Sequence, residues 1–288
     1  MGSELLIDIW QPHALLLPFV CLLMLTTAIV AAHLRLIPWW LGLVSLIVQT
    51  HLAFVYVVAV LGVLVGASLV AHAIGVARRD GVGPVEVVGA LLRRRMVLVS
   101  VAVLAVAWIQ PVIEPVTGPG EGNLHRLATN AGGGDLTVGA ASAVKIVAAV
   151  LAIPPGWTRW GFEDAVPSTP LTQTPEGARL VLLGLPGGAV SALAVLLVVA
   201  VLGALAWSLR SPSQRPARAA ALVSLAGVVV AVGGLTIQTV SVTGLGNHQV
   251  RWIFALAVFV QVVIVWGVSE LLRVRPLGSA VPAWAGLA

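Results

Sequence analysis

An uncharged run from Leu36 to Ala77 is the feature that most limits how this chain can fold. As a single α-helix the run would extend about 60 Å, whereas the hydrocarbon of a bilayer is about 30 Å thick. Tilting a helix does not absorb a twofold excess of length. The run therefore predicts two membrane crossings, and its polar cluster, Gln49, Thr50 and His51, marks the reversal between them.

The composition of the whole chain agrees with a membrane protein. Of the 288 residues, 59% are hydrophobic and 9% are charged, whereas soluble domains carry about 25% charged residues. The single cysteine, Cys21, excludes an intrachain disulfide. The net charge of +5 comes without a basic stripe interleaved with aromatic residues, so no nucleic-acid partner is expected.

Residues 1–288 are predicted to form one all-α, polytopic transmembrane domain with about seven helices. The predicted spans are 13–32, 36–50, 52–77, 96–112, 187–208, 217–242 and 251–272. If all seven segments cross, eleven of the sixteen basic residues fall on one side of the membrane. Because Lys and Arg accumulate on the cytoplasmic side, the N-terminus is predicted outside and the C-terminus inside.

Residues 113–186 then form one large external segment. The run 138–153 within it is apolar but short, and Lys145 lies in its middle. If this run crossed once, every later arginine cluster would be placed outside. It is therefore predicted to be an interfacial or re-entrant helix.

Three polar clusters fall at the predicted outer face. Gln49 and His51 lie in the first reversal, Glu114 follows the fourth span, and His248 and Arg251 open the seventh. Ionisable groups at membrane depth are costly, and they face cavities or partners. These five residues are the candidate substrate-binding residues. Metal, nucleotide and nucleophile motifs such as HExxH, Walker A and GxSxG are absent from the sequence, so no metal or cofactor is expected.

Each candidate has an expected role. Arg251 offers a forked set of donors that suits a phosphate, with His51 or His248 as a further donor. Pro111 and Pro115 are predicted to end the fourth span, so that the carboxylate of Glu114 points into a common external cleft. There it would orient a hydroxyl group of a bound substrate or pair with Arg251.

Structural roles are the alternatives. Arg251 would then extend to the interface beside Trp252, and His51 and Gln49 would satisfy the backbone of a turn. Glu114 would be a solvated loop acid.

Four blocks of sequence resemble the later half of polytopic GT-C-type glycosyltransferases, which are bacterial membrane enzymes. These blocks, in this order, are WQPHALLLPFVCLLML, LIVQTHLAFVYVV, WIQPVIEPVTGPGEGNL and NHQVRWIFAL. In the third block, Gly120 and Glu121 interrupt the P-G-N-L ending that the family motif carries. The resemblance implies a bacterial plasma-membrane protein that uses a polyprenyl-phosphate sugar donor at the outer face.

The same resemblance implies that the catalytic acid of the first external loop is missing from this chain, so no catalytic residue is assigned. A membrane-embedded half of such an enzyme is expected, inactive alone and completed by an N-terminal half or by a partner protein. One alternative is a non-catalytic scaffold or partner subunit of a cell-envelope enzyme. A transporter of a lipid-linked substrate is a further alternative, although paired repeats are not visible.

The arginine distribution predicts the sidedness of two loops. A Ser213→Cys variant should react with a membrane-impermeant thiol reagent only from the cytoplasmic side, because residue 213 lies among clustered arginines. A Ser168→Cys variant should react from the outside. Labelling of both variants from the same side would contradict the seven-span topology.

Overall fold

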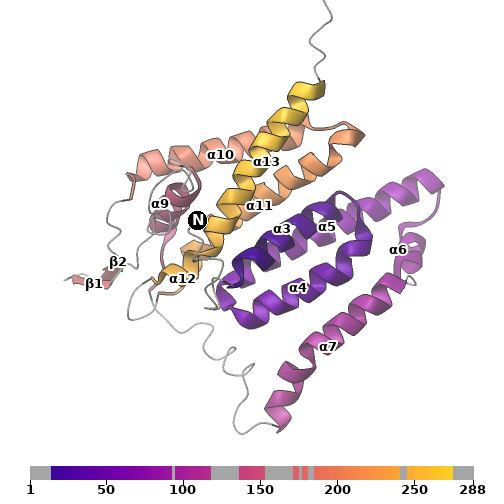
Figure 1. The fold of residues 1–288 in the computed structure, drawn as a ribbon, viewed down its shortest axis with the longest axis horizontal. Coiled ribbons are helices and arrows are strands. Elements are labelled where there is room, and N and C mark those ends of the chain that lie inside the picture. The colour runs from indigo at the N-terminus through magenta and orange to yellow at the C-terminus, as the bar shows by residue number, and fades with distance from the viewer. Residues whose placement is uncertain are drawn as a thin grey trace, which may run out of the picture.

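The computed structural model of the chain describes residues 14–92, 95–117, 136–152, 171–174, 177–180, 185–240 and 245–274. The α-helices are α3 (Leu16–Val30), α4 (Ile37–Thr50), α5 (Val55–Asp80), α6 (Pro84–Leu92), α7 (Arg95–Thr117), α9 (Ala140–Leu151), α10 (Gly188–Ser208), α11 (Arg215–Ile237), α12 (Asn247–Val250) and α13 (Trp252–Val274) (Figure 1). The 3-10 helices are η1 (Leu34–Leu36), η2 (Leu52–Phe54) and η5 (Pro212–Gln214), and an antiparallel hairpin joins β1 (Leu171–Thr174) to β2 (Gly177–Leu180).

The prediction of an all-α polytopic membrane protein is confirmed. Within the described ranges, five helices are long and apolar enough to cross a membrane. They correspond to α5, α7, α10, α11 and α13. α3 and α4 coincide with the first two predicted spans but have 15 and 14 residues, fewer than the roughly 17–25 of a typical span.

The uncharged run from residue 36 to residue 77 is divided at the predicted polar cluster. α4 ends at Thr50, and His51 adopts an extended conformation with φ −153° and ψ 119°. The His51 ring accepts a hydrogen bond from the Ala53 amide at 3.2 Å, and η2 then leads into α5. A side-chain cap therefore performs the reversal, in place of a glycine or proline turn.

α11 lies at the centre of the bundle and packs against α3, α5, α9, α10 and α13. Small residues allow its neighbours to approach closely. A Cβ atom added at Gly227 would lie 2.6 Å from Cδ1 of Leu256, and one at Gly234 would lie 3.2 Å from Cβ of Tyr56. The shape of the core therefore depends on glycine at these two contacts with α13 and α5.

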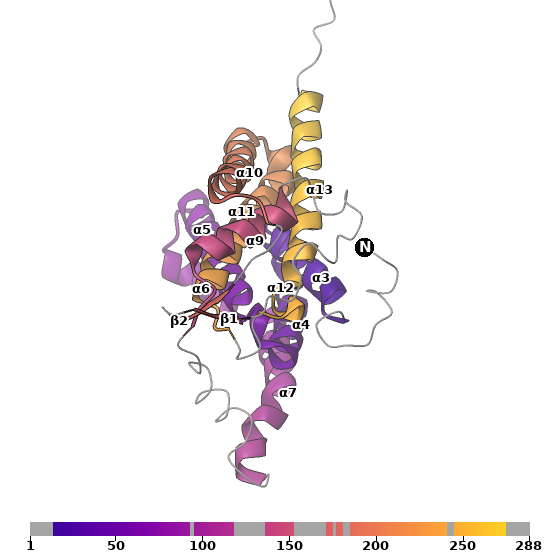
Figure 2. The same cartoon turned by 90° about the vertical axis from the view of Figure 1, so that its left-hand side faces the viewer.

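The run 138–153 forms a helix, as predicted, and this helix packs against other helices of the bundle. Its helix, α9, packs between α10, α11 and α13 (Figure 2), and Ala143 and residues 146–151 are buried. Burial is favoured because these side chains are apolar, whereas Lys145 is half-buried and its Cε lies 3.8 Å from the Cβ position at Gly188. Twelve residues extend about 18 Å, less than the roughly 30 Å of hydrocarbon, and the position of α9 as an interfacial or re-entrant helix stays a prediction.

Backbone pairing connects the start of α9 to the end of α11. The Val138 amide donates to the Gln238 carbonyl at 3.0 Å, and the Val240 amide donates to the Leu136 carbonyl at 3.0 Å. At the other end of α9, Nε2 of Gln261 on α13 donates to the Leu151 carbonyl at 2.8 Å. The last carbonyls of a helix lack intrahelical donors, so an amide side chain is needed where the helix ends inside protein.

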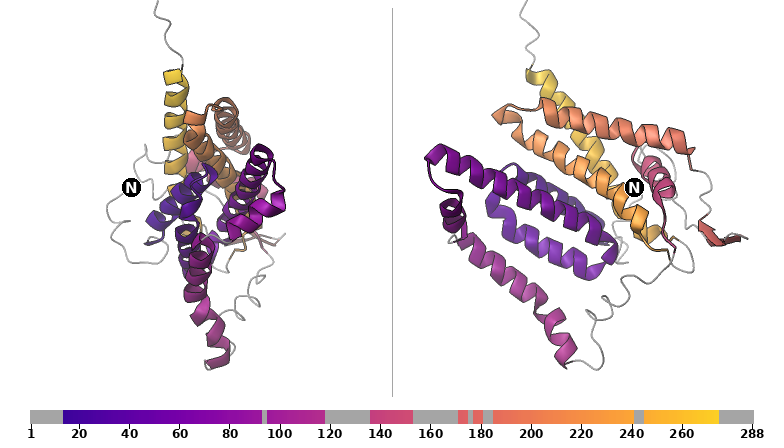
Figure 3. Two further views of the ribbon diagram at one scale, coloured as in Figure 1. Left: turned by 90° about the vertical axis from the view of Figure 1, so that its right-hand side faces the viewer. Right: turned by 180° about the vertical axis from the view of Figure 1, so that it is seen from behind.

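The expected helix stop at Pro111 and Pro115 is wrong. α7 continues through both prolines to Thr117, because neighbouring groups can satisfy backbone positions that proline leaves open in a membrane helix. α7 packs against α4 at the edge of the bundle (Figure 3). Its apolar window is 6% buried, compared with 33–56% for the other four spanning candidates.

Replacing Gln261 should reveal the cost of leaving the end of α9 without a donor. The Gln261→Leu variant keeps the approximate volume and leaves the Leu151 carbonyl unsatisfied, so we expect a loss of about 1–3 kcal/mol in unfolding free energy. Thermal unfolding of the purified protein in detergent would measure it.

Gln110→Leu is the matched control, since Gln110 is exposed on α7 and makes no hydrogen bond within the described residues. Equal melting temperatures for Gln261→Leu and Gln110→Leu would contradict the capping role of Gln261.

Candidate functional site

An aromatic cluster of Phe19, Phe54 and Trp252 brings three elements together at one end of the bundle. The ring centroids of Phe19 and Phe54 are 5.3 Å apart at 68°, and those of Phe19 and Trp252 are 6.0 Å apart at 85°. Both pairs are edge-to-face, an arrangement that aromatic rings prefer. The cluster thus fixes α3, η2 and the start of α13 relative to one another.

His51 lies beside this cluster. Its ring meets the Phe54 ring edge-to-face, with centroids 6.1 Å apart. Nδ1 accepts the Ala53 amide hydrogen, so in the neutral ring the proton is on Nε2. His51 therefore carries one nitrogen committed to the turn and one that is a donor.

Arg251 directly precedes Trp252 of the cluster in the chain. Its Cζ is 5.5 Å from the centroid of the Phe254 ring, which is a cation–π contact. Nε and Nη1 of its guanidinium are buried. The preceding turn is held by Gln249, whose Oε1 accepts the Gly246 amide hydrogen at 3.0 Å. The structure therefore brings His51 and Arg251 to the same aromatic cluster, although 200 positions separate them in the sequence.

Glu114 is placed away from the aromatic cluster. Glu114 lies near the C-terminal end of α7, which projects away from α12 (Figures 1 and 2). No ion pair between Glu114 and Arg251 occurs within the described part of the chain. The backbone of His248 belongs to α12, while its side chain lies outside the described residues.

Gln49 has a structural contact that the sequence interpretation missed. Its Nε2 donates to the Ala107 carbonyl on α7 at 2.9 Å. Ala107 is four residues before Pro111, and proline has no amide hydrogen to donate to that carbonyl. Gln49 therefore supplies the donor that Pro111 removes, and this interhelical bond explains why α7 can continue past the proline.

A second polar contact lies one residue further along α7. The Trp108 indole N–H donates to Oγ of Ser45 on α4 at 3.0 Å. Ser45 is 1% exposed, so this hydrogen bond is protected from competition. The sequence does carry a signal for the Gln49–Ala107 contact. It is a proline inside an apolar helix together with a glutamine at the end of a neighbouring helix.

A metal centre is not found among the described side chains of the candidate site. No cluster of three His, Cys, Asp or Glu side chains suitable for a metal occurs among the residues that the structure describes. Comparison with protein-family models, with curated proteins and with solved structures finds no match to this chain. Any functional interpretation therefore depends on the geometry above and on the sequence motifs.

The Gln49–Ala107 contact can be tested by a double-mutant cycle with Pro111. Gln49→Leu should destabilise the protein by about 1 kcal/mol, the scale of interhelical hydrogen bonds in membranes. In a Pro111→Ala background the amide of residue 111 can donate to Ala107, so the same substitution should cost much less. Unfolding in detergent would measure a coupling of about 1 kcal/mol.

Gln110→Leu, combined with Pro111→Ala, is the control and should show additive effects. If Gln49→Leu costs the same with proline or alanine at position 111, Gln49 does not replace the missing amide.

Proposed function

We propose that this membrane domain binds a lipid-linked sugar donor at its outer face, as part of a GT-C-like glycosyltransferase. The observation that carries the proposal is the pair of donors next to one aromatic cluster: His51 contacts the Phe54 ring, and Arg251 directly precedes Trp252. The four sequence blocks that resemble such enzymes include both residues.

The chemistry of the pair suits a phosphate next to an apolar chain. The guanidinium of Arg251 is permanently charged and can donate two parallel hydrogen bonds to phosphate oxygens. The Nε2 proton of His51 supplies another donor. The Phe19, Phe54 and Trp252 rings are buried, and their packing holds the elements that carry the two donors at the same end of the bundle.

Transfer to an acceptor also requires a general base to remove the hydroxyl proton. His51 and Arg251 are assigned to donor binding, and Glu114 remains a predicted residue for acceptor orientation. The base is therefore expected from another protein segment. The 288-residue chain alone is expected to bind the donor without transferring sugar.

A non-catalytic partner subunit is the second candidate function. The observation that favours it is the exposure of α7. This helix contacts the bundle through α4, and most of its length is exposed. A spanning helix of this kind is suited to packing against a second membrane protein. In this case donor binding would be absent and association with another envelope protein would remain.

Donor binding distinguishes the two functions. Purified protein in nanodiscs should bind a short-chain polyprenyl-phosphate sugar, and Arg251→Gln should weaken Kd by about tenfold or more, because a charge-assisted hydrogen bond is lost. Arg210→Gln is the charge-matched control. Arg210 follows the C-terminal end of α10, where its guanidinium lies over the Trp207 ring.

Equal binding by wild type, Arg251→Gln and Arg210→Gln would contradict the proposal that Arg251 binds the donor phosphate. Sugar transfer by the isolated chain would contradict the expectation that the base comes from another segment, and would direct attention to Glu114.

A further inference from the structure

A groove between α3, α4 and α7 lies at the arginine-rich end of the bundle, away from the His51–Arg251 site. The cavity has a volume of about 1010 Å³, at the upper end of the roughly 300–1,000 Å³ typical of ligand pockets. Its floor and walls are apolar and include Leu25, Trp39, Val99 and Val103. We propose that this groove binds a phospholipid with an anionic headgroup.

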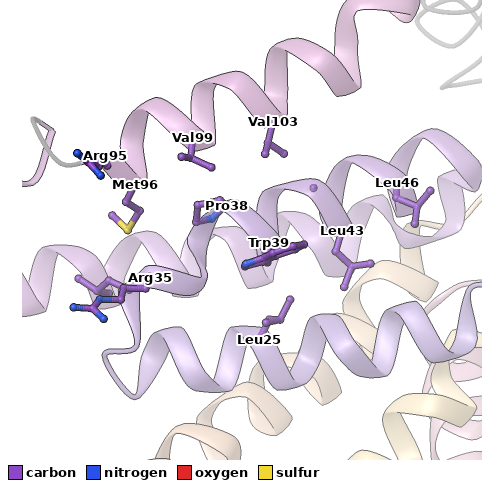
Figure 4. A pocket seen from close by; sticks show the side chains of 12 residues that line it. Leu25, Arg35, Pro38, Trp39, Leu43, Leu46, Arg95, Met96, Val99 and Val103 are labelled. Carbon is purple, nitrogen blue, oxygen red and sulfur yellow. The ribbon is translucent and has the colours of Figure 1, made fainter.

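Two arginines define the headgroup end. Arg35 in η1 and Arg95 at the start of α7 line the same end of the cavity, beside Met96, and Leu46 lies at the opposite end (Figure 4). Both arginines are exposed, and neither forms an ion pair within the described ranges. No acidic side chain is present among the described residues that line the groove. The two guanidiniums are therefore available to a phosphate, which they can bind through forked hydrogen bonds.

The length of the groove matches one leaflet. From Arg35 to Leu46 the rise along the chain is about 16 Å if helical throughout, close to half of the roughly 30 Å hydrocarbon thickness. Trp39, one turn beyond Arg35, is 73% exposed, as is typical of a tryptophan at the membrane interface. A lipid whose phosphate contacts the arginines would thus place its acyl chain along Leu25, Leu43 and Val103.

The arginine distribution places this end of the bundle in the cytoplasmic leaflet, where basic pockets between helices bind anionic headgroups. The groove and the proposed donor site are at opposite ends of the bundle, so the two proposals can fail independently. α7 contacts the bundle through α4, and a lipid between α7 and α3 would fill the side that protein leaves open.

Lipid retention tests the proposal. The full chain is reconstituted in nanodiscs of phosphatidylglycerol and phosphatidylcholine, extracted gently, and analysed by native mass spectrometry. Wild type should retain phosphatidylglycerol in preference to phosphatidylcholine. The double variant Arg35→Gln, Arg95→Gln should lose this preference, with affinity for phosphatidylglycerol about thirtyfold weaker, since each interfacial basic residue contributes about fivefold.

Two controls separate this site from general effects. Arg210→Gln with Arg273→Gln removes the same charge from the same end, where Nε of Arg210 already donates to the Trp207 carbonyl and Arg273 pairs with Glu270. This control should retain phosphatidylglycerol. Val99→Trp should block the groove without changing charge, whereas Val106→Trp, at an exposed position on α7 outside the groove, should have no effect.

Equal retention by wild type and the Arg35→Gln, Arg95→Gln variant would overturn the proposal. In nanodiscs that also contain a polyprenyl phosphate, preferential retention of that lipid over phosphatidylglycerol, abolished by the same variant, would also overturn the proposal, because the occupant would then be the donor lipid.

Discussion

Every backbone hydrogen-bonding group inside a bilayer needs a partner, because no water is present to provide one. The described part of this chain meets that requirement with glutamine side chains where helices end or contain proline. Gln49 donates to the Ala107 carbonyl that Pro111 leaves open, and Gln261 donates to the Leu151 carbonyl at the end of α9. The arrangement of α7 and α9 depends on these two bonds.

A third glutamine acts at the arginine-rich end. Gln214 is 3% exposed; its Oε1 accepts the Ser211 amide hydrogen at 3.3 Å, and its Nε2 donates to the Glu270 carbonyl at 3.3 Å. It therefore connects the α10–α11 turn to the last turns of α13. Because glutamine is uncharged and carries both a donor and an acceptor, it can satisfy backbone groups with a smaller desolvation cost than an ionised side chain.

The fold class and the approximate positions of the long apolar helices could be predicted from the sequence, because long apolar runs indicate membrane spans. The reversal at Gln49–His51 was also predictable from its polar residues. The course of α7 was not, since the effect of Pro111 depends on a glutamine 62 positions earlier in the chain. The burial of α9 was not predictable either, because the amphipathic pattern of a short helix does not distinguish lipid from protein as the apolar environment.

The candidate site was predictable in part. His51 and Arg251 were selected for their charge and hydrogen-bonding chemistry, and the aromatic cluster that joins them is a tertiary feature. Gln49 was assigned to the site, but its amide is used by α7. The apolar groove with Arg35 and Arg95 has no local sequence signature, because α3, α4 and α7 contribute single faces to it.

The claim that Gln49 donates to the carbonyl left open by Pro111 is tested most directly by isotope-edited infrared spectroscopy, with a ¹³C=¹⁸O label at Ala107. The account predicts a hydrogen-bonded carbonyl band in the wild type that moves to higher frequency in Gln49→Leu and returns when Pro111→Ala is added. A free-carbonyl band in the wild type, or a band unchanged by Gln49→Leu, would contradict it.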